Sequence, residues 1–174
     1  MTMATEGQLE RAGEYWQVRY VRPLPHPPEK VWRALTEPEH MEAWFPATVV
    51  GEWEVGAPLR FEFKRAGVDA IEGEVFTVNP PKQLEFTWGD EMLRFELEPD
   101  GDGCVLTLVA AIHELGKAAR DGAGWHACLD NLAYSLDGTQ PPWETTGDQR
   151  WEQVHPDYVM RFGPEASTIG PPEG

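Results

Sequence analysis

The sequence has 174 residues and a formal net charge of −16, because 30 acidic residues outweigh 14 Lys and Arg residues. A chain this acidic repels nucleic-acid phosphates and anionic lipid surfaces, so we expect neither as a partner. With 41% hydrophobic residues, it can bury one sizeable core, and its length favours a single domain. No apolar run approaches the roughly 20 residues that span a bilayer, and the N-terminus lacks the order of a signal peptide. We therefore expect a cytoplasmic protein.

The expected elements begin with a strand over Tyr15–Leu24, which ends in a proline-rich stretch. The residues before it, 1–14, are expected to form a flexible N-terminus.

Two short helices are expected within residues 28–46. The first carries Val31, Ala34 and Leu35 at helical spacing. Thr36 is expected to end this helix and to cap the second, because its hydroxyl can accept a hydrogen bond from an unpaired backbone N–H. The second helix would present an apolar face made of Met41, Trp44 and Phe45.

A run of strands follows, in which apolar and polar residues alternate with a period of two. The segment 100–103, with sequence DGDG, has the composition of a hairpin turn. This alternation predicts an antiparallel sheet with one solvated face and one covered face, and the ionisable residues of its strands are expected to point outward. The apolar residues of the alternation are Leu59, Phe61 and Phe63, then Leu84, Phe86 and Trp88, then Leu93, Phe95 and Leu97.

The cover of this sheet is expected to be a long helix that begins within 117–124 and continues to Asp137. Gly138 is well placed to end it, because glycine readily adopts the left-handed conformation after a helix. The predicted domain therefore covers residues 15–138. The apolar stripe of the helix consists of Trp125, Leu129, Leu132 and Leu136.

The remaining segment, 139–174, is expected to be an extension with one or two short helices. Asp148 can cap a helix that carries Trp151 and Val154, and Pro156 should interrupt it before a second turn. The extension has too many aromatic residues to remain in water. We expect it to pack on its own domain, with packing on a neighbouring subunit as the alternative.

Several of these motifs resemble those of the START-like helix-grip superfamily, also called SRPBCC, and within it the branch named for the activator of the ninety-kilodalton heat-shock protein's ATPase. The resemblance covers about 15–138. It implies an α+β helix-grip fold, in which a curved antiparallel sheet of about six or seven strands wraps around a long C-terminal helix, with two short helices after the first strand. The residues that carry it are Val31, Trp32, Ala34, Leu35, Thr36 and Pro38, then Trp44, Phe45 and Pro46, and later Gly73, Val75, Pro80, Pro81, Leu84, Phe86, Thr87, Trp88, Gly124 and Trp125.

A sheet curled around a helix leaves a space at one end, and the resemblance implies a cavity there. Bulky rings and leucines of the predicted inner faces would line it, which favours a ligand of the same apolar character. The predicted pocket residues are Trp44, Phe61, Phe63, Phe86, Trp88, Phe95, Trp125, Leu129 and Leu132.

Catalytic motifs are scarce in this sequence. Its two serines do not lie in a GxSxG turn, and its histidines lack the spacing of a metal site. His126 and Asp130 lie four apart on one helix and are expected to form an exposed, helix-stabilising contact. Cys104 and Cys128 lack a CxxC spacing and are expected to be buried and reduced. We therefore predict no catalytic residue, no metal and no cofactor.

The sequence thus favours a non-catalytic carrier or sensor of a small apolar or aromatic ligand, acting as a monomer or a homodimer. One alternative is an enzyme that uses the cavity for cyclase, hydrolase or dehydratase chemistry. Its polar candidates would be His126, Asp130, Glu114 and Tyr134. The other alternative is a protein-interaction module resembling a co-chaperone, with a role related to stress.

Overall fold

The computed structural model describes residues 6–64, 66–145 and 148–169. In these residues, eight strands form one antiparallel sheet with the order β1-β2-β8-β7-β6-β5-β4-β3. The strands are β1 (Gln8–Ala12), β2 (Tyr15–Leu24), β3 (Thr48–Val50), β4 (Pro58–Glu62), β5 (Ile71–Asn79), β6 (Gln83–Trp88), β7 (Glu91–Asp100) and β8 (Gly103–Ile112). The helices are α1 (Pro28–Thr36), α2 (Pro38–Met41), α3 (Ala118–Asp137) and α4 (Gln149–Phe162), with short 3-10 turns η1 (Leu115–Lys117) and η2 (Pro164–Ser167).

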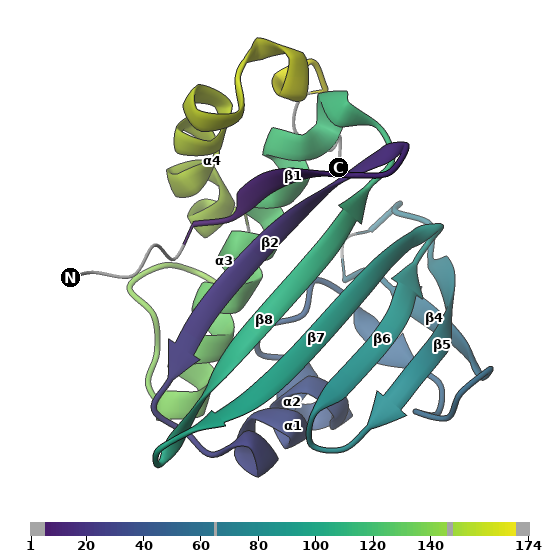
Figure 1. Cartoon of the computed structure of the whole chain (residues 1–174), viewed down its shortest axis with the longest axis vertical. Helices are drawn as coiled ribbons and strands as arrows, with labels where there is room; N and C mark the ends of the chain where they lie inside the picture. The colour runs from purple at the N-terminus through teal and green to yellow at the C-terminus, as the bar shows by residue number, and fades with distance from the viewer. Residues whose placement is uncertain (1–5, 65, 146–147, 170–174) are drawn as a thin grey trace.

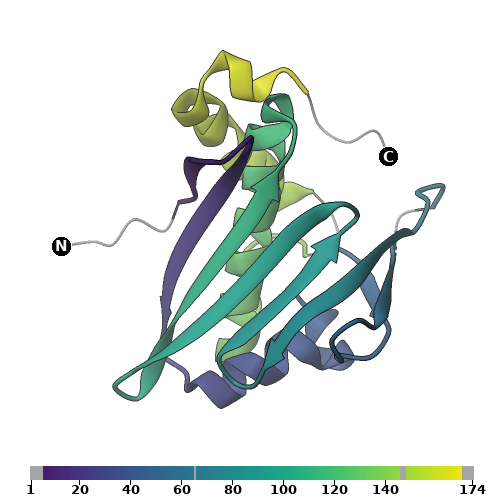
Figure 2. The ribbon, with the colours of Figure 1, turned by 45° about the vertical axis from the view of Figure 1, so that its right-hand side comes forward.

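The long helix α3 crosses one face of the sheet, and the other face is left uncovered (Figure 1; Figure 2). The helices α1 and α2 lie near the end of the sheet where the β7–β8 hairpin turns, and α4 lies against α3 beside β1. This arrangement confirms the predicted α+β helix-grip fold. The sheet has eight strands rather than six or seven, because β1 and the three-residue β3 extend its two edges.

The edge strand β1 lies within the segment that was expected to be flexible. It pairs with β2 from Gln8↔Arg19 to Ala12↔Tyr15. Its sequence, QLERA, lacks the apolar alternation of a strand, so the backbone hydrogen bonds to β2 hold it rather than any side-chain pattern of its own. Residues 1–5 of the same segment lie outside the described part of the chain.

The first strand and the helical pair lie close to where the sequence places them, with one correction. The strand β2 has the predicted bounds, Tyr15–Leu24. The Thr36 hydroxyl, however, donates a hydrogen bond to the Trp32 carbonyl at 2.9 Å, one turn back in α1. It therefore does not cap α2, whose N-cap position is Glu37. A threonine at a helix end can bond to the preceding turn as easily as to the next helix.

The helix α3 follows η1 and ends at Gly138, which has the left-handed φ of 71° that the predicted C-cap requires. Its predicted apolar stripe of Trp125, Leu129, Leu132 and Leu136 is buried. Among the helices of the described residues, none is both long enough and apolar enough to cross a bilayer.

The helix α4 is one continuous helix, so the predicted interruption at Pro156 is wrong. Pro156 lies on its exposed side, where water can bond the carbonyl group that a proline leaves without a donor. The opposite side packs on α3, and Tyr158 is fully buried there. The approach is close, because a Cβ added to Gly122 would lie 3.3 Å from the Tyr158 ring.

Candidate functional site

The predicted pocket residues come together on the inner face of the sheet, under α3. The ring centroids of Phe61 and Trp88 lie 4.8 Å apart, and those of Trp88 and Trp125 lie 5.5 Å apart. Leu129 and Leu132 from α3 belong to the same apolar core. The structure thus joins rings from α3, from the sheet and from the segment after α2. We define the aromatic set as the predicted pocket rings together with two further rings, Phe45 and Trp53, which are described next. The predicted rings in it are Trp44, Phe61, Phe63, Phe86, Trp88, Phe95 and Trp125.

Two members of the aromatic set were not predicted as pocket residues. Phe45 is the more central, with its ring centroid 5.3 Å from that of Trp88 and 5.9 Å from that of Trp125. Trp53 lies 5.2 Å from Phe86, and its indole N–H donates to the Thr36 carbonyl at 2.7 Å. Phe45 could have been found, since it sits on the predicted apolar face with Met41 and Trp44. Trp53 lies in a loop among glutamates and had no periodic signal.

The aromatic set has a buried centre and a half-buried edge. Phe61 and Phe86 are completely buried, whereas Phe63, Trp88 and Trp53 are only partly buried. Phe63 follows the last residue of β4, and Trp88 is the last residue of β6. The aromatic set therefore reaches the surface where these two strands end.

The rings of the aromatic set contact one another and occupy the space between α3 and the sheet. In the described part of the chain, the two most prominent hollows are open to the surface, and neither includes a predicted pocket residue. One of them lies at the β7–β8 hairpin, beside Pro23–Pro25. The internal cavity therefore stays a prediction.

A carboxylate lies on the inner face of the sheet, contrary to the expectation that ionisable strand residues point outward. Glu91 starts β7 and alternates in register with the buried residues Leu93, Phe95 and Leu97. It is 7% exposed. Its two oxygens accept hydrogen bonds from the Lys117 ammonium at 2.7 Å and from the His113 backbone N–H at 2.8 Å. If the period-two alternation of β7 is counted from Glu91 instead of Leu93, it places this carboxylate on the inner face of the sheet.

A second carboxylate lies beside this pair. Asp121 is one helical turn after Lys117, with 3.8 Å between its Oδ2 and the ammonium, and it accepts a hydrogen bond from Arg120 at 2.8 Å. Burial raises the pKa of Asp121, although the charges of Arg120 and Lys117 act in the opposite direction. We call Glu91, Lys117 and Asp121 the polar edge.

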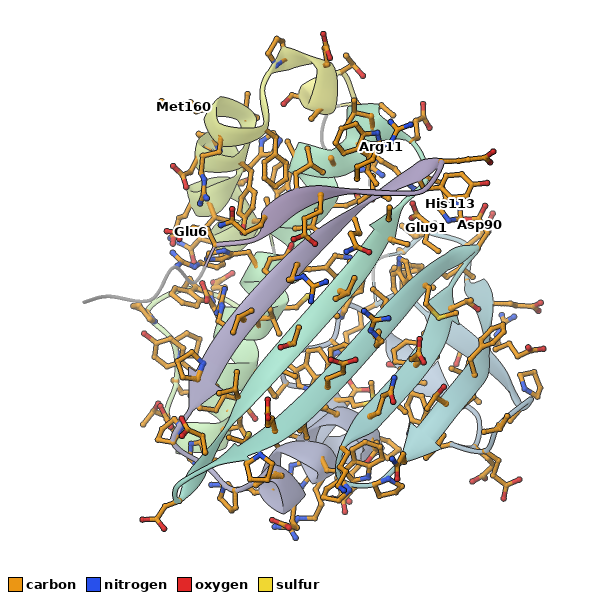
Figure 3. All side chains as sticks on the ribbon, viewed as in Figure 1. Glu6, Arg11, Asp90, Glu91, His113 and Met160 are labelled. Carbon is orange, nitrogen blue, oxygen red and sulfur yellow. The ribbon has the colours of Figure 1, made fainter. Side chains whose placement is uncertain are left out.

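The polar edge adjoins the aromatic set. Trp88 and Glu91 are directly opposite each other in the β6–β7 ladder, so their side chains leave the same face of the sheet. Lys117, Asp121 and Trp125 lie four residues apart along one side of α3. Figure 3 shows Glu91 near Asp90 and His113, at the end of the sheet where β7 begins and β8 ends.

A separate buried polar group surrounds Asp130, on the side of α3 that faces β2 and α4. Asp130 accepts hydrogen bonds from Arg22 and Arg150, each at 2.8 Å, and lies 3.2 Å from His126 Nε2. The expectation of an exposed His126–Asp130 contact is therefore wrong, since the side chains are only 9% and 15% exposed. Burial alone raises the pKa of Asp130, but the hydrogen bonds and charges of His126 and Arg22 outweigh it and hold the pKa well below its usual value.

The phenol of Tyr158 links this group to the N-terminal segment. Its oxygen accepts a hydrogen bond from the Gly7 N–H at 2.7 Å and lies 2.8 Å from His126 Nδ1. Burial raises the pKa of Tyr158 to about 12, so the phenol keeps its proton at neutral pH. The group holds α4 and the N-terminal segment to α3.

The other polar candidates are not assembled into a site. Glu114 is exposed, and Tyr134 packs against Trp143 with 5.3 Å between ring centroids. Cys104 and Cys128 are buried and unbonded, and burial raises the pKa of both thiols, that of Cys128 to about 12. In the described residues, no three His, Cys, Asp or Glu side chains are grouped as metal ligands would be.

A family model described as "Activator of Hsp90 ATPase homolog 1-like protein" matches residues 25–137, about two thirds of the chain. The chain belongs to this family. The matched region contains the aromatic set and the polar edge. Arg22, Arg150 and Tyr158, by contrast, lie outside it. The sequence resemblance to this branch is thus confirmed, and the family fold supports a ligand-binding domain in general.

Solved structures share the fold along most of the chain. The solution structure of BPP1335 from Bordetella parapertussis is 26% identical, covers 92% of this chain and 95% of its own, and has a TM-score of 0.67. CalU16 from Micromonospora echinospora is 19% identical with 97% of both chains covered and a TM-score of 0.74. EF2215 from Enterococcus faecalis, a conserved protein of unknown function, is 19% identical with 89% of both chains covered and a TM-score of 0.72. No curated protein matches the sequence significantly.

Proposed function

We propose that the chain binds a small, largely apolar or aromatic molecule between α3 and the sheet, beside Trp88, as a carrier or sensor that catalyses no reaction. The observation that carries this proposal is the continuity of the aromatic set from the buried centre to its half-buried edge at Trp88 and Phe63. Ligand sites are lined predominantly by hydrophobic and aromatic side chains, so a set of rings that reaches the surface suits such a site.

Ligand entry at this edge requires the rings there to move, because the aromatic set fills its own space. Phe63 and Trp88 are the rings best able to do so, since both are partly buried and both lie at or beyond the end of a strand. Each ring pair that separates costs about 0.5–1.5 kcal/mol beyond its buried area. A planar aromatic ligand replaces those contacts with its own, which is why we propose this ligand class.

The proposal is tested by titrating the protein with an environment-sensitive hydrophobic dye. We expect saturation at one site per chain and weaker binding to the Trp88→Ala variant. The matched control is Trp143→Ala, which removes a tryptophan that stacks on Arg150 outside the aromatic set. Binding that does not saturate, or that Trp143→Ala weakens as much as Trp88→Ala, would contradict the proposal. Mass spectrometry of small molecules retained by the purified protein then identifies the ligand.

An enzyme that acts on this ligand is the second candidate, because the polar edge brings two carboxylates to the same place. The raised pKa of Asp121 favours its protonated form, which can donate a proton to a bound molecule. The test is whether the retained molecule is converted on incubation with the protein but not with its Asp121→Asn variant. Conversion by neither would leave the carrier as the better proposal, and conversion by both would show that the protein is an enzyme in which Asp121 is not the acid.

A further inference from the structure

Lys117 keeps donor capacity that its neighbours in the described part of the chain do not use. Its ammonium has three N–H groups, and one of them bonds Glu91 Oε1 at 2.7 Å. Asp121 Oδ2, at 3.8 Å, is too far for a second hydrogen bond. The side chain is 20% exposed, so the remaining donors can reach a molecule at the edge of the aromatic set.

The carboxylates of the polar edge, by contrast, already hold donors. Glu91 uses one oxygen for Lys117 and the other for the His113 N–H, and it is 7% exposed. Asp121 accepts a hydrogen bond from Arg120. What the polar edge offers to a ligand is therefore a hydrogen-bond donor, fixed in place by the buried Glu91.

This donor is linked through Glu91 to a ring that the proposed ligand would touch. Trp88 faces Glu91 across the β6–β7 ladder, and Glu91 holds Lys117. Trp125, whose ring lies 5.5 Å from that of Trp88, stands on the same side of α3 as Lys117. A ring system packed on Trp88 therefore directs a substituent at its rim toward the Lys117 ammonium.

The charge around this donor selects a neutral acceptor over an anion. Glu91 lies beside the ammonium, Asp90 precedes Glu91 in the chain, and the whole chain carries a net charge of −16. An anionic ligand meets repulsion from all of them, whereas a carbonyl oxygen accepts the hydrogen bond without it. We infer that the ligand is an aromatic or polycyclic carbonyl compound whose oxygen accepts a hydrogen bond from Lys117. This inference rests on the proposed binding of an apolar molecule at Trp88.

The test compares 2-acetylnaphthalene with 2-isopropylnaphthalene, which has a similar shape but no oxygen, by calorimetric titration of the full chain. We expect the ketone to bind at least about tenfold more tightly, as a hydrogen bond from a charged donor implies. 2-Naphthoate, the anionic analogue, should bind more weakly than the ketone. Equal binding of the ketone and the hydrocarbon, or tighter binding of the naphthoate, would overturn the inference and leave the proposed function standing. Binding of none of the three would overturn both.

Variants assign the preference to Lys117. Lys117→Met alone leaves Glu91 buried without its cation, so the double variant Lys117→Met with Glu91→Gln is the informative one. We expect it to lose the preference for the ketone and to keep its affinity for the hydrocarbon. The control is Lys30→Met, which removes a lysine that bonds the Leu136 carbonyl near the other end of α3. A ketone preference that survives in the double variant would overturn the inference. The comparison of probes on the unaltered protein remains decisive if the double variant does not fold.

Discussion

Arg22 and Asp130 form an ion pair with 2.8 Å between Nη1 and Oδ1, and it joins the inner face of β2 to α3. Both side chains are at most 15% exposed, so the pair is shielded from water and salt. Arg150 from α4 binds the other oxygen of the same carboxylate. One aspartate thereby fixes three elements to one another.

The first prediction is that Asp130→Ala strongly destabilises the protein. Its loss leaves Arg22 and Arg150 without their shared carboxylate, and breaking a buried pair from one side typically costs about 3–5 kcal/mol. The measurement is the free energy of unfolding in urea. Glu10→Ala is the control, because Glu10 pairs with Arg19 where both side chains are more than a third exposed, and such pairs contribute about 0–1 kcal/mol. If the two variants lost similar amounts of unfolding free energy, Asp130 would not be the residue that fixes the three elements to one another.

The second prediction concerns acid. Because the pKa of Asp130 is lowered in the folded state, its ionised form contributes stability above the unfolded value of about 3.9, and this contribution is lost as the pH falls toward the folded pKa. The stability advantage of the parent protein over Asp130→Asn should therefore shrink as the pH falls from about 5. Asp121 has a raised pKa, which reverses the sign. The stability of the parent relative to Asp121→Asn should therefore increase as the pH falls through the acidic range. Parallel pH profiles for the parent and both variants would refute this.

The third prediction is that Tyr158→Phe destabilises the protein by about 1–3 kcal/mol. The ring still fills its site, but the Gly7 N–H and His126 Nδ1 both lose the oxygen that they share. Tyr15→Phe is the matched control, since Tyr15 is 46% exposed. Thermal unfolding of the two variants compares them directly. An unchanged Tyr158→Phe variant would show that the phenol does not hold the N-terminal segment.

The fourth prediction is that the aromatic set is the main source of the core's stability. Trp44 and Trp125 are 3% and 7% exposed, and truncating such a ring to alanine costs about 3–5 kcal/mol. We expect a large fall in melting temperature for both variants. The control is Phe76→Ala, because Phe76 is 47% exposed at the irregularity in β5 and contributes little buried area. Melting within a couple of degrees of the parent would show that these rings are misplaced.

The sequence predicted those elements whose side chains repeat with the period of their structure. The bounds of β2 and the end of α3 at Gly138 match the structure, because a run of alternating residues and a left-handed glycine are local signals. The strand β1 has no such pattern and exists through its backbone pairing with β2. Pro156 predicts an interruption because a proline removes one hydrogen bond. An exposed position tolerates that loss when the other side of the helix is buried.

Sequence reasoning could predict the aromatic residues of the candidate site but not its charged residues. The rings could be assigned to one face because apolar alternation places them there. Arg22 and Glu91 occupy the same inner faces, but a charged residue is ordinarily taken to point outward. Asp130 of α3 pairs with Arg22, and Lys117, the N-cap residue of α3, pairs with Glu91. Such pairing across distant segments leaves no local signal in the sequence.

The most direct test of the account is NMR observation of the tryptophan indole N–H signals while 2-isopropylnaphthalene is added. Trp88→Phe and Trp125→Phe variants assign the two signals of interest, and Trp143 and Trp151 serve as internal controls because both lie where α3 meets the C-terminal extension. If the ligand binds beside Trp88, the Trp88 and Trp125 signals will shift and saturate together at one equivalent per chain, while the two controls stay in place. Saturation without movement of Trp88 and Trp125, or shifts confined to Trp143 and Trp151, would contradict it.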